Sequence, residues 1–271
     1  VRSKDSFARI SIPLRIRLPI MLAIIGGSGL TQLSSLDVSH QQVVRTPYGE
    51  PSGALTFGRI GKQEVVFLAR HGYGHTIPPH LVNYRANIWA LSRGAGATRI
   101  ISVASVGGIR ADLAPGTLVV PHQIIDYTWG RQMTFHDSLD VPAVHIDFTD
   151  PYAEPMRRQI FDAATRSGQT IIDGAVYAAS QGPRLETAAE IDRFERDGAH
   201  VVGMTGMPEA SLAREAELPY AALAVVANWA AGRGNNTHAI QFESLEAVLN
   251  ESMKQVRKVL ENFCDTGDCT S

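Results

Sequence analysis

The sequence predicts a single-domain α/β fold in which helices flank a central, mixed but mostly parallel sheet. Three observations indicate this fold: short apolar runs rich in β-branched residues recur along the chain, amphipathic segments lie between several of them, and 44% of the 271 residues are hydrophobic. Runs that are apolar throughout are typical of strands buried on both faces. The expected strands span residues 22–25, 65–69, 100–104, 117–120, 175–179, 201–204 and 222–227.

Helix signals lie between the strands. Apolar residues recur at spacings of three and four over residues 81–91, before a glycine that ends the pattern. The stretch TAAEIDRFERDG, residues 187–198, opens with Thr187 and Glu190 at the spacing of a capping box and closes with glycine. A last amphipathic helix is expected from about Ser244.

One domain accounts for residues 21–271, because no repeat, linker or low-complexity stretch interrupts the chain between the first strand and the last helix. Residues 1–20 carry five basic residues, but arginines and prolines break up their apolar stretches. They lack the continuous apolar run of a signal peptide or a membrane span, so we expect an extension outside the fold.

The charge balance and the cysteines exclude some classes of protein. A formal net charge of -2 gives no basic surface for nucleic acid. The only cysteines, Cys264 and Cys269, fall in the last eight residues and beyond the expected last helix, so they cannot cross-link a core. We therefore expect a cytoplasmic protein with unremarkable tail thiols.

A glycine-rich turn, IIGGSGL at residues 24–30, follows the first expected strand. Such a turn lets backbone N–H groups approach an anion, so a dinucleotide and a free phosphate are both candidates. A dinucleotide site would need a further glycine at the position of Gln32 and an acidic residue after a second strand, and both are missing. Phosphate is therefore favoured over an NAD-dependent oxidoreductase.

Polar residues also follow other expected strands, where ligands collect in α/β sheets. A guanidinium group with several small hydroxyls suits the oxygens of a phosphate. Each residue alone has an ordinary explanation as a surface charge or a helix cap, and their repetition at strand ends favours a site. The residues at these strand ends are Ser28, Arg70, His71, Ser105, Gly107 and Thr205.

Six long segments, in order along the chain, resemble the trimeric purine nucleoside phosphorylase and methylthioadenosine phosphorylase family. They are IIGGSGL, TPYGEPSG, ARHGYGHTIPPHLVNYRANIWAL, SVGGI, GPRLETAAEI and VVGMTGMPEASLAREAELPY. The resemblance covers about residues 22–263. It implies the nucleoside phosphorylase fold, a homotrimer, no metal or organic cofactor, and phosphorolysis, in which inorganic phosphate as co-substrate displaces the base of a purine nucleoside.

The resemblance also implies which residues bind phosphate and sugar. Phosphate is expected at Ser28, Arg70, His71, Ser105 and Thr205. The sugar is expected against Met204, with Ala104, Gly107 and Leu185 also among the substrate-binding residues. Methylthioadenosine phosphorylases tend to carry Thr-Ala in place of Ala104-Ser105, so the hydroxyl is displaced by one position here.

The expected base is a 6-oxopurine. A carboxylate only accepts hydrogen bonds, so it matches the N1–H of hypoxanthine or guanine and mismatches the bare N1 of adenine. Glu186 in GPRLET stands where 6-oxopurine phosphorylases carry a glutamate, although a helix dipole also favours Glu at such a position. In VANWAAG, Asn228 and Ala230 replace the two aspartates of adenine-preferring relatives. The expected catalytic residues are Asn228, Arg70 and Glu186.

The 5′ end of the nucleoside is expected against an apolar wall. The stretch THAIQFESLEAV offers Ile240, Phe242 and Leu245, with His238 upstream, and these residues would equally serve as core packing. Apolar side chains suit a thioether, whereas phosphorylases of ordinary nucleosides use a histidine for the 5′-hydroxyl. His145 in AVHIDF resembles the residue that this family takes from the neighbouring subunit, though a lone histidine is also typical of plain structure.

The sequence therefore predicts phosphorolysis of 5′-methylthioinosine. A general inosine/guanosine phosphorylase and a methylthioadenosine phosphorylase with a diverged base pocket are the alternatives within the family. A nucleoside hydrolase and a non-catalytic purine-binding protein are alternatives outside it. The histidines of HGYGHTIPPH, residues 71–80, do not indicate zinc, because glycines and prolines prevent a helical ligand pair. Nucleic acid and membrane partners are not expected.

Overall fold

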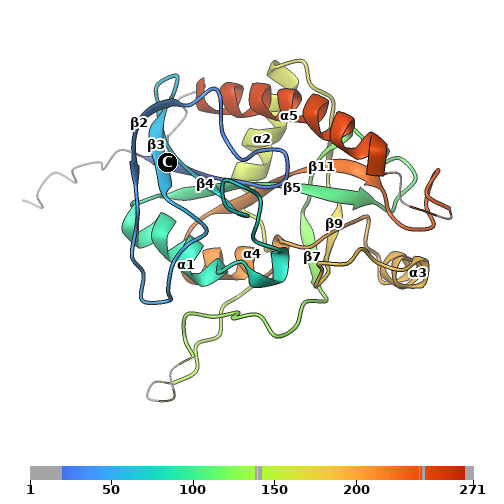
Figure 1. The fold of residues 1–271 in the computed structure, drawn as a ribbon, viewed down its shortest axis with the longest axis horizontal. Coiled ribbons are helices and arrows are strands. Elements are labelled where there is room, and N and C mark those ends of the chain that lie inside the picture. Colours follow the sequence, from blue (N-terminus) through green and yellow to red (C-terminus); the bar gives the residue numbers. More distant parts are fainter. Residues whose placement is uncertain (1–19, 138, 140–141, 238, 240–241, 266–271) are drawn as a thin grey trace, which may run out of the picture.

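A mixed sheet of eleven strands forms the centre of the fold (Figure 1). The structure is a computed structural model, which describes residues 20–265 apart from 138, 140–141, 238 and 240–241. The strands are β1 Met21–Gly26, β2 Asp37–Gln42, β3 Leu55–Ile60, β4 Gln63–Ala69, β5 Arg99–Gly108, β6 Leu118–Val120, β7 Gln123–Asp126, β8 Ile171–Asp173, β9 Val176–Ala179, β10 Val201–Gly203 and β11 Tyr220–Trp229. The helices are α1 Tyr84–Trp89, α2 Glu154–Arg166, α3 Ala188–Arg196, α4 Gly206–Glu215 and α5 Phe242–Asp265, with a 3-10 turn at Pro79–Leu81 and a π-helical turn at Ala90–Gly94.

Parallel pairing brings four strand ends to one edge of the sheet. The strand order is β2-β3-β4-β1-β5-β10-β9-β7, with β11 and then β6 and β8 branching from β5. β1 is parallel to β4 and β5, and β5 is parallel to β11. β10 instead runs antiparallel to the outer part of β5, with Val201 opposite Gly108. The predicted α/β class is confirmed, and this antiparallel strand makes the sheet mixed.

Both faces of the sheet are buried, which explains the continuously apolar strand sequences. In β1, Leu22 and Ile24 pack in one hydrophobic cluster with α2 and α5, whereas Ala23 and Ile25 pack in another with α1 and α4. Figure 1 shows α2 and α5 along one face and α1 and α4 along the other. The seven predicted strands are all present.

Four strands were not predicted, and each lacks a buried apolar run. β2 has the sequence DVSHQQ and is exposed along its whole length at the edge of the sheet. β3 is interrupted by Gly58 and Arg59, while β7 and β8 are short and only partly buried. Hydrophobic patterning does not reveal β2, β7 and β8 because they bury little apolar surface, and it misses β3, which is mostly buried, because Thr56, Gly58 and Arg59 separate its apolar residues.

The helix signals agree with the structure at all three predicted positions, and the pattern over residues 81–91 corresponds to α1 with the π-helical turn that follows it. Thr187 caps α3 with the predicted reciprocal bonds to Glu190. α5 begins at Phe242, close to the predicted start. α4 was not predicted, because Gly206 and Pro208 at its start are helix breakers in sequence terms, and the backbone there is indeed non-helical.

The expectation for Cys264 was wrong. This residue lies inside α5 and is 1% exposed, because the helix continues beyond Phe263 and packs the thiol into the apolar layer. Burial raises its pKa to about 12, which keeps the thiol protonated and unreactive. Residues 1–19 and Cys269 lie outside the described residues, so the predicted extension stays a prediction.

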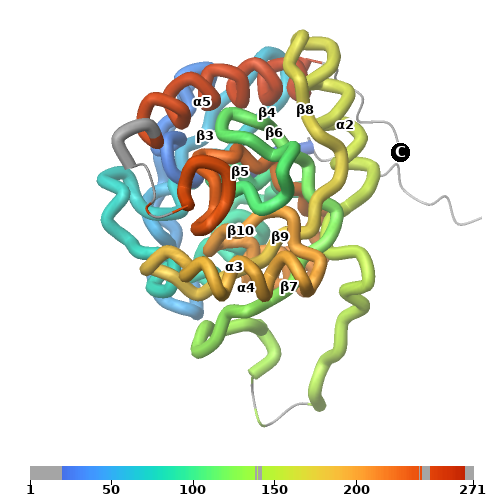
Figure 2. Tube along the Cα trace, turned by 90° about the vertical axis from the view of Figure 1, so that its right-hand side faces the viewer, coloured from blue at the N-terminus to red at the C-terminus, as the bar shows by residue number. Residues whose placement is uncertain are grey.

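Between β7 and α2 lies a long segment, residues 127–153, and much of its described part projects from the body of the molecule (Figures 1 and 2). It carries exposed Trp129, Met133 and Val144. Of the helices in the described ranges, none combines the length and apolar character needed to cross a membrane.

Candidate active site

A cavity of about 360 Å³ lies where β1, β4, β5 and β11 end. It brings together thirteen of the residues that the sequence singled out: Ser28, Arg70, His71, Ala104, Ser105, Gly107, Leu185, Glu186, Met204, Thr205, Asn228, Ala230 and Leu245. His145 is exposed on the projecting segment and does not line the cavity. The side chain of Phe242, like His238 and Ile240, lies outside the described residues.

The glycine-rich turn lines the cavity through Gly27 and Ser28. At Gly27 a Cβ atom would lie 2.6 Å from the Val103 carbonyl oxygen and 2.9 Å from Arg70 Nη1, so this close passage requires glycine. The Ser105 hydroxyl donates to the Ser28 carbonyl oxygen at 3.2 Å and holds the turn. The chain then continues in further turns towards β2, without the helix that a dinucleotide site requires.

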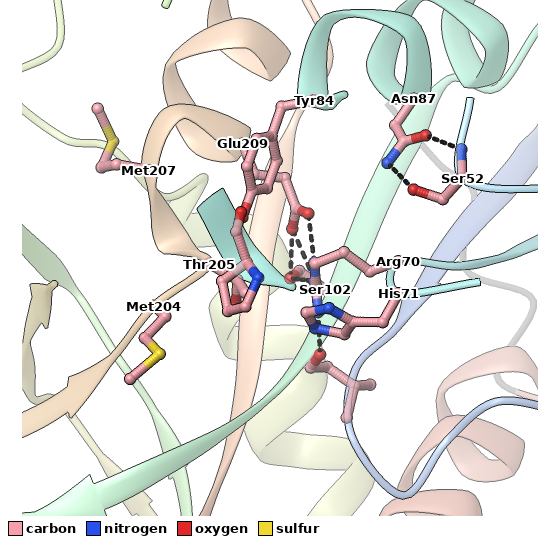
Figure 3. Close-up of polar contacts among 12 residues, drawn as sticks. Ser52, Arg70, His71, Tyr84, Asn87, Ser102, Met204, Thr205, Met207 and Glu209 are labelled. Atoms are coloured by element: carbon pink, nitrogen blue, oxygen red, sulfur yellow. Dashed lines mark hydrogen bonds and ion pairs between the residues drawn. The ribbon is translucent and has the colours of Figure 1, made fainter. Parts of the chain in front are cut away.

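Arg70 follows β4 and is fully buried. Its Nε and Nη2 donate to the two carboxylate oxygens of Glu209 at 2.6 and 2.8 Å, and Nη2 also donates to Ser102 Oγ at 2.7 Å (Figure 3). Nη1 donates to the Val103 carbonyl oxygen at 3.0 Å. An arginine has five N–H groups, so one N–H of Nη1 remains for a ligand. The edge of the guanidinium formed by Nε and Nη2 therefore faces the Glu209 carboxylate, and only the remaining N–H of Nη1 is available to a phosphate.

Glu209 is the main functional residue that sequence reasoning missed. It lies in α4, is 1% exposed, and accepts further hydrogen bonds from Ser102 Oγ at 2.7 Å and Tyr220 Oη at 2.9 Å. Burial alone would lower the pKa of Arg70, but the Glu209 carboxylate raises it, so the guanidinium stays charged. The signal in the sequence was an acidic residue within the otherwise apolar stretch GMPEASLA, residues 206–213.

His71 is held as a neutral imidazole. Its Nδ1 lies 2.8 Å from the Ile77 carbonyl oxygen, which can only accept, so Nδ1 carries the proton and Nε2 has a free lone pair. Burial first, and then the charge of Arg70, lower its pKa to about 4.

The stability of the protein should therefore depend on His71 below neutral pH. Between its ordinary pKa of 6.5 and the folded value of about 4, the unfolded chain takes up a proton that the folded chain does not. We expect the free energy of unfolding to decrease as the pH falls through this window, and to decrease less in His71→Gln. Urea unfolding of both proteins at about pH 7 and about pH 5 measures this difference. Equal pH dependence of the two proteins would contradict it.

Glu186 and Asn228 line the same cavity. Ser180 Oγ donates to Glu186 Oε1 at 2.5 Å, which orients the carboxylate and leaves its second oxygen available. Asn228 Nδ2 donates to the Trp229 carbonyl oxygen at 2.6 Å, so Oδ1 and one amide hydrogen remain. A bulge in β11, where the register against β5 shifts between Val226 and Asn228, brings this side chain into the cavity.

Thr205 and Met204, which follow β10, also line the cavity. Thr205 precedes α4 but its side chain makes no capping bond to the helix, so the hydroxyl is not used as an N-cap. Met204 packs close to Gly182, where an added Cβ would lie 2.5 Å from its Sδ. Much of the remaining lining is apolar: Ile77, Pro78, Pro79, Leu245 and Leu249.

His75 also lines the cavity, although the sequence analysis considered it only as a zinc ligand and did not predict it as a substrate-binding residue. It adopts a left-handed φ of 52°, its Nε2 lies 3.3 Å from Ser28 Oγ, and its ring lies 4.7 Å from that of His71. The sequence signal was its place in the glycine-rich HGYGH. Within the described ranges, no three His, Cys, Asp or Glu side chains are grouped so that they could hold a metal ion.

A buried arginine, small hydroxyls, an amide and a carboxylate thus lie around one cavity of a mixed α/β sheet. The chain belongs to the phosphorylase superfamily, whose family profile matches residues 21–265.

Relatives agree over most of the chain. One from Pseudomonas syringae pv. tomato, named a probable S-methyl-5′-thioinosine phosphorylase, is 52% identical over 239 residues, which cover 88% of this chain and 96% of the relative. The 6-oxopurine nucleoside phosphorylase of Pyrococcus furiosus is 43% identical over 242 residues, which cover 87% and 90%. The solved methylthioadenosine phosphorylase of Schistosoma mansoni in complex with adenine is 31% identical and has a TM-score of 0.87 over 93% of each chain.

Proposed function

We propose that the protein catalyses phosphorolysis of a 6-oxopurine 5′-methylthionucleoside: S-methyl-5′-thioinosine and phosphate give hypoxanthine and 5-methylthioribose 1-phosphate. The observation that carries this proposal is that Glu186 and Asn228 line one cavity together with the Ser28 turn and Arg70. Relatives named S-methyl-5′-thioinosine phosphorylase and 6-oxopurine nucleoside phosphorylase support it.

The base-binding end suits a 6-oxopurine. The free oxygen of Glu186 can accept from N1–H, and the remaining amide hydrogen of Asn228 can donate to O6. Asn228 Oδ1 can accept from N7–H as the departing base is protonated. That bond forms only as the glycosidic bond breaks, so it stabilises the transition state more than the bound substrate.

The phosphate-binding end suits an incoming anion. The free N–H of Arg70 Nη1, the turn at Ser28 and the hydroxyl of Thr205 offer donors to its oxygens, while the Ser105 hydroxyl, which donates to the Ser28 carbonyl, holds that turn in place. Because Glu209 neutralises Arg70, these directed hydrogen bonds position the phosphate next to the anomeric carbon, more than net charge does. The negative charge of phosphate then stabilises the oxocarbenium character of the sugar, with no covalent enzyme intermediate.

The 5′ group is assigned from the apolar lining. Leu245 and Leu249 on α5, with Pro78 and Pro79, give a surface that suits a thioether better than a hydroxyl. A general inosine/guanosine phosphorylase is the second candidate, because His75 adds a polar ring to the same cavity and one relative is a 6-oxopurine nucleoside phosphorylase.

We further propose a cytoplasmic homotrimer that needs no metal or organic cofactor, with inorganic phosphate as co-substrate. The exposed apolar residues Trp129, Met133 and Val144 on the projecting segment suit contact with a second copy of the chain. The exposed His145 on the same segment would then reach the 5′ pocket of a neighbour.

The test is a substrate panel. Methylthioinosine, methylthioadenosine and inosine are each incubated with the protein, with and without phosphate, and release of the base is followed by chromatography. We expect phosphate-dependent release of hypoxanthine, faster from methylthioinosine than from inosine. Faster cleavage of methylthioadenosine would contradict the base assignment, faster cleavage of inosine the 5′ assignment, and cleavage without phosphate the phosphate site.

A further inference from the structure

Arg131, at the base of the projecting segment, joins two walls of the cavity. One wall is the segment after β9 that leads to Glu186, and the other is the segment after β10 that carries Met204 and Thr205. Its Nη1 donates to the carbonyl oxygens of Met204 at 2.8 Å and Met207 at 2.5 Å. Its Nη2 donates to the carbonyl oxygens of Gln181 at 2.8 Å and Ser180 at 3.4 Å, and Nε donates to the Gln181 side chain at 3.2 Å. One guanidinium therefore binds the segment after β9 and the segment after β10 at the same time.

These two segments lie beyond the hydrogen bonds that join β9 to β10. The parallel ladder ends with Gly203 opposite Ala179, and a backbone bond from Ser180 N to the Gly203 oxygen extends it by one residue. From there one segment leads to Glu186 and the other to Thr205. Beyond this point, hydrogen bonds from Arg131 join the two segments in place of the backbone hydrogen bonds of the sheet.

The partners of Arg131 indicate a bridging role more than a charge pair. Across the part of the chain that the structure describes, Arg131 forms no ion pair with a carboxylate. Its guanidinium lies 5.5 Å from the ring centroid of Tyr84, which helps to fix the plane of the guanidinium. A planar group with five donors can satisfy carbonyls on two segments, whereas a lysine ammonium cannot reproduce that geometry.

We propose that Arg131 is a positioning residue that sets the separation between the base-binding wall and the sugar-binding wall of the cavity. The inference rests on the proposed function, which places the purine at Glu186 and the sugar at Met204. Arg131 does not itself line the cavity, so it acts through the backbone of the segments that do. A substrate that touches both walls depends on this spacing, whereas a ligand that touches one wall does not.

Ligands that contact one wall or both walls test the proposal. In Arg131→Met, we expect hypoxanthine alone to bind within about threefold of the wild-type affinity, while kcat/KM for methylthioinosine falls by about 10–100-fold, since small misplacements of reacting groups have effects of this size. In Arg131→Lys, we expect kcat/KM for methylthioinosine to lie between the values of the wild type and of Arg131→Met. Arg166→Met, at an exposed arginine near the end of α2, is the matched control and should behave like the wild type. Calorimetry without phosphate measures binding of base and nucleoside separately.

Two outcomes would overturn the proposal. Unchanged methylthioinosine turnover in Arg131→Met would show that the spacing does not depend on Arg131. Equal weakening of hypoxanthine and nucleoside, together with easier unfolding in urea, would show a general structural role. Failure of the proposed function is seen separately, as absence of phosphate-dependent turnover by the wild-type protein.

Discussion

Replacing Glu209 with alanine is expected to lower the free energy of unfolding by about 3–5 kcal/mol, because it leaves the fully buried Arg70 guanidinium without its counter-charge. Ser102 and Tyr220 lose their shared acceptor in the same change. The remaining guanidinium is then free to reorient, so phosphate binding should fail even in the folded fraction. Urea unfolding at fixed protein concentration and the KM for phosphate measure the two effects.

Two control variants show whether the loss of stability in Glu209→Ala comes from the unpaired buried charge or from lost packing. Glu251→Ala removes an exposed pair with Lys254, and we expect it to change stability by less than about 1 kcal/mol. In the double variant Arg70→Met with Glu209→Leu, no buried charge is left unpaired, so much of the stability should return while phosphorolysis stays absent. A loss below about 1 kcal/mol in Glu209→Ala would show that the buried pair is not structural, contrary to the geometry.

The predictable parts of the fold and of the cavity share one physical cause. Strands buried on both faces must be apolar along their whole length, and the polar residue that ends such a run marks the strand end where ligands collect. Arg70 and Ser105 follow from this rule, because β4 and β5 run parallel on either side of β1 towards the same edge, whereas Asn228 was expected from the family resemblance. Thr205 also lines the cavity, but the rule for parallel strands does not explain its position, because β10 runs antiparallel to β5.

What the sequence did not reveal depends on partners distant in the chain. Glu209 contacts Arg70, which lies 139 positions away, and Gly206 and Pro208 hide the helix that carries it. Arg131 is one arginine among many in the sequence, and only the folded chain shows that its donors are shared between two cavity walls. The polar edge strand β2 escaped prediction for the converse reason, that it buries too little apolar surface to leave a pattern.

Replacing Asn228 with alanine is expected to lower kcat/KM for methylthioinosine by about 10²–10⁴-fold, since it removes the group that stabilises the base as it leaves. The structure holds Asn228 for this role: the β11 bulge directs it into the cavity, and its bond to the Trp229 carbonyl fixes the amide. Steady-state kinetics should show the loss mainly in kcat, because the bond to N7–H forms only in the transition state.

Asn228→Asp gives the sharper test, because a carboxylate accepts hydrogen bonds but cannot donate to O6. We expect it to lose activity towards 6-oxopurine nucleosides and to gain relative activity towards 6-aminopurine nucleosides, whose amino group donates. Asn236→Ala is the matched control: Asn236 donates to the same Trp229 carbonyl at 2.6 Å but does not line the cavity. A comparable loss of activity in Asn236→Ala would show that the loss in the Asn228 variants comes from disturbing the backbone at Trp229. An unchanged ratio of inosine to adenosine cleavage in Asn228→Asp would place the base elsewhere, and the pairing of Asn228 with Glu186 would no longer account for the choice of purine.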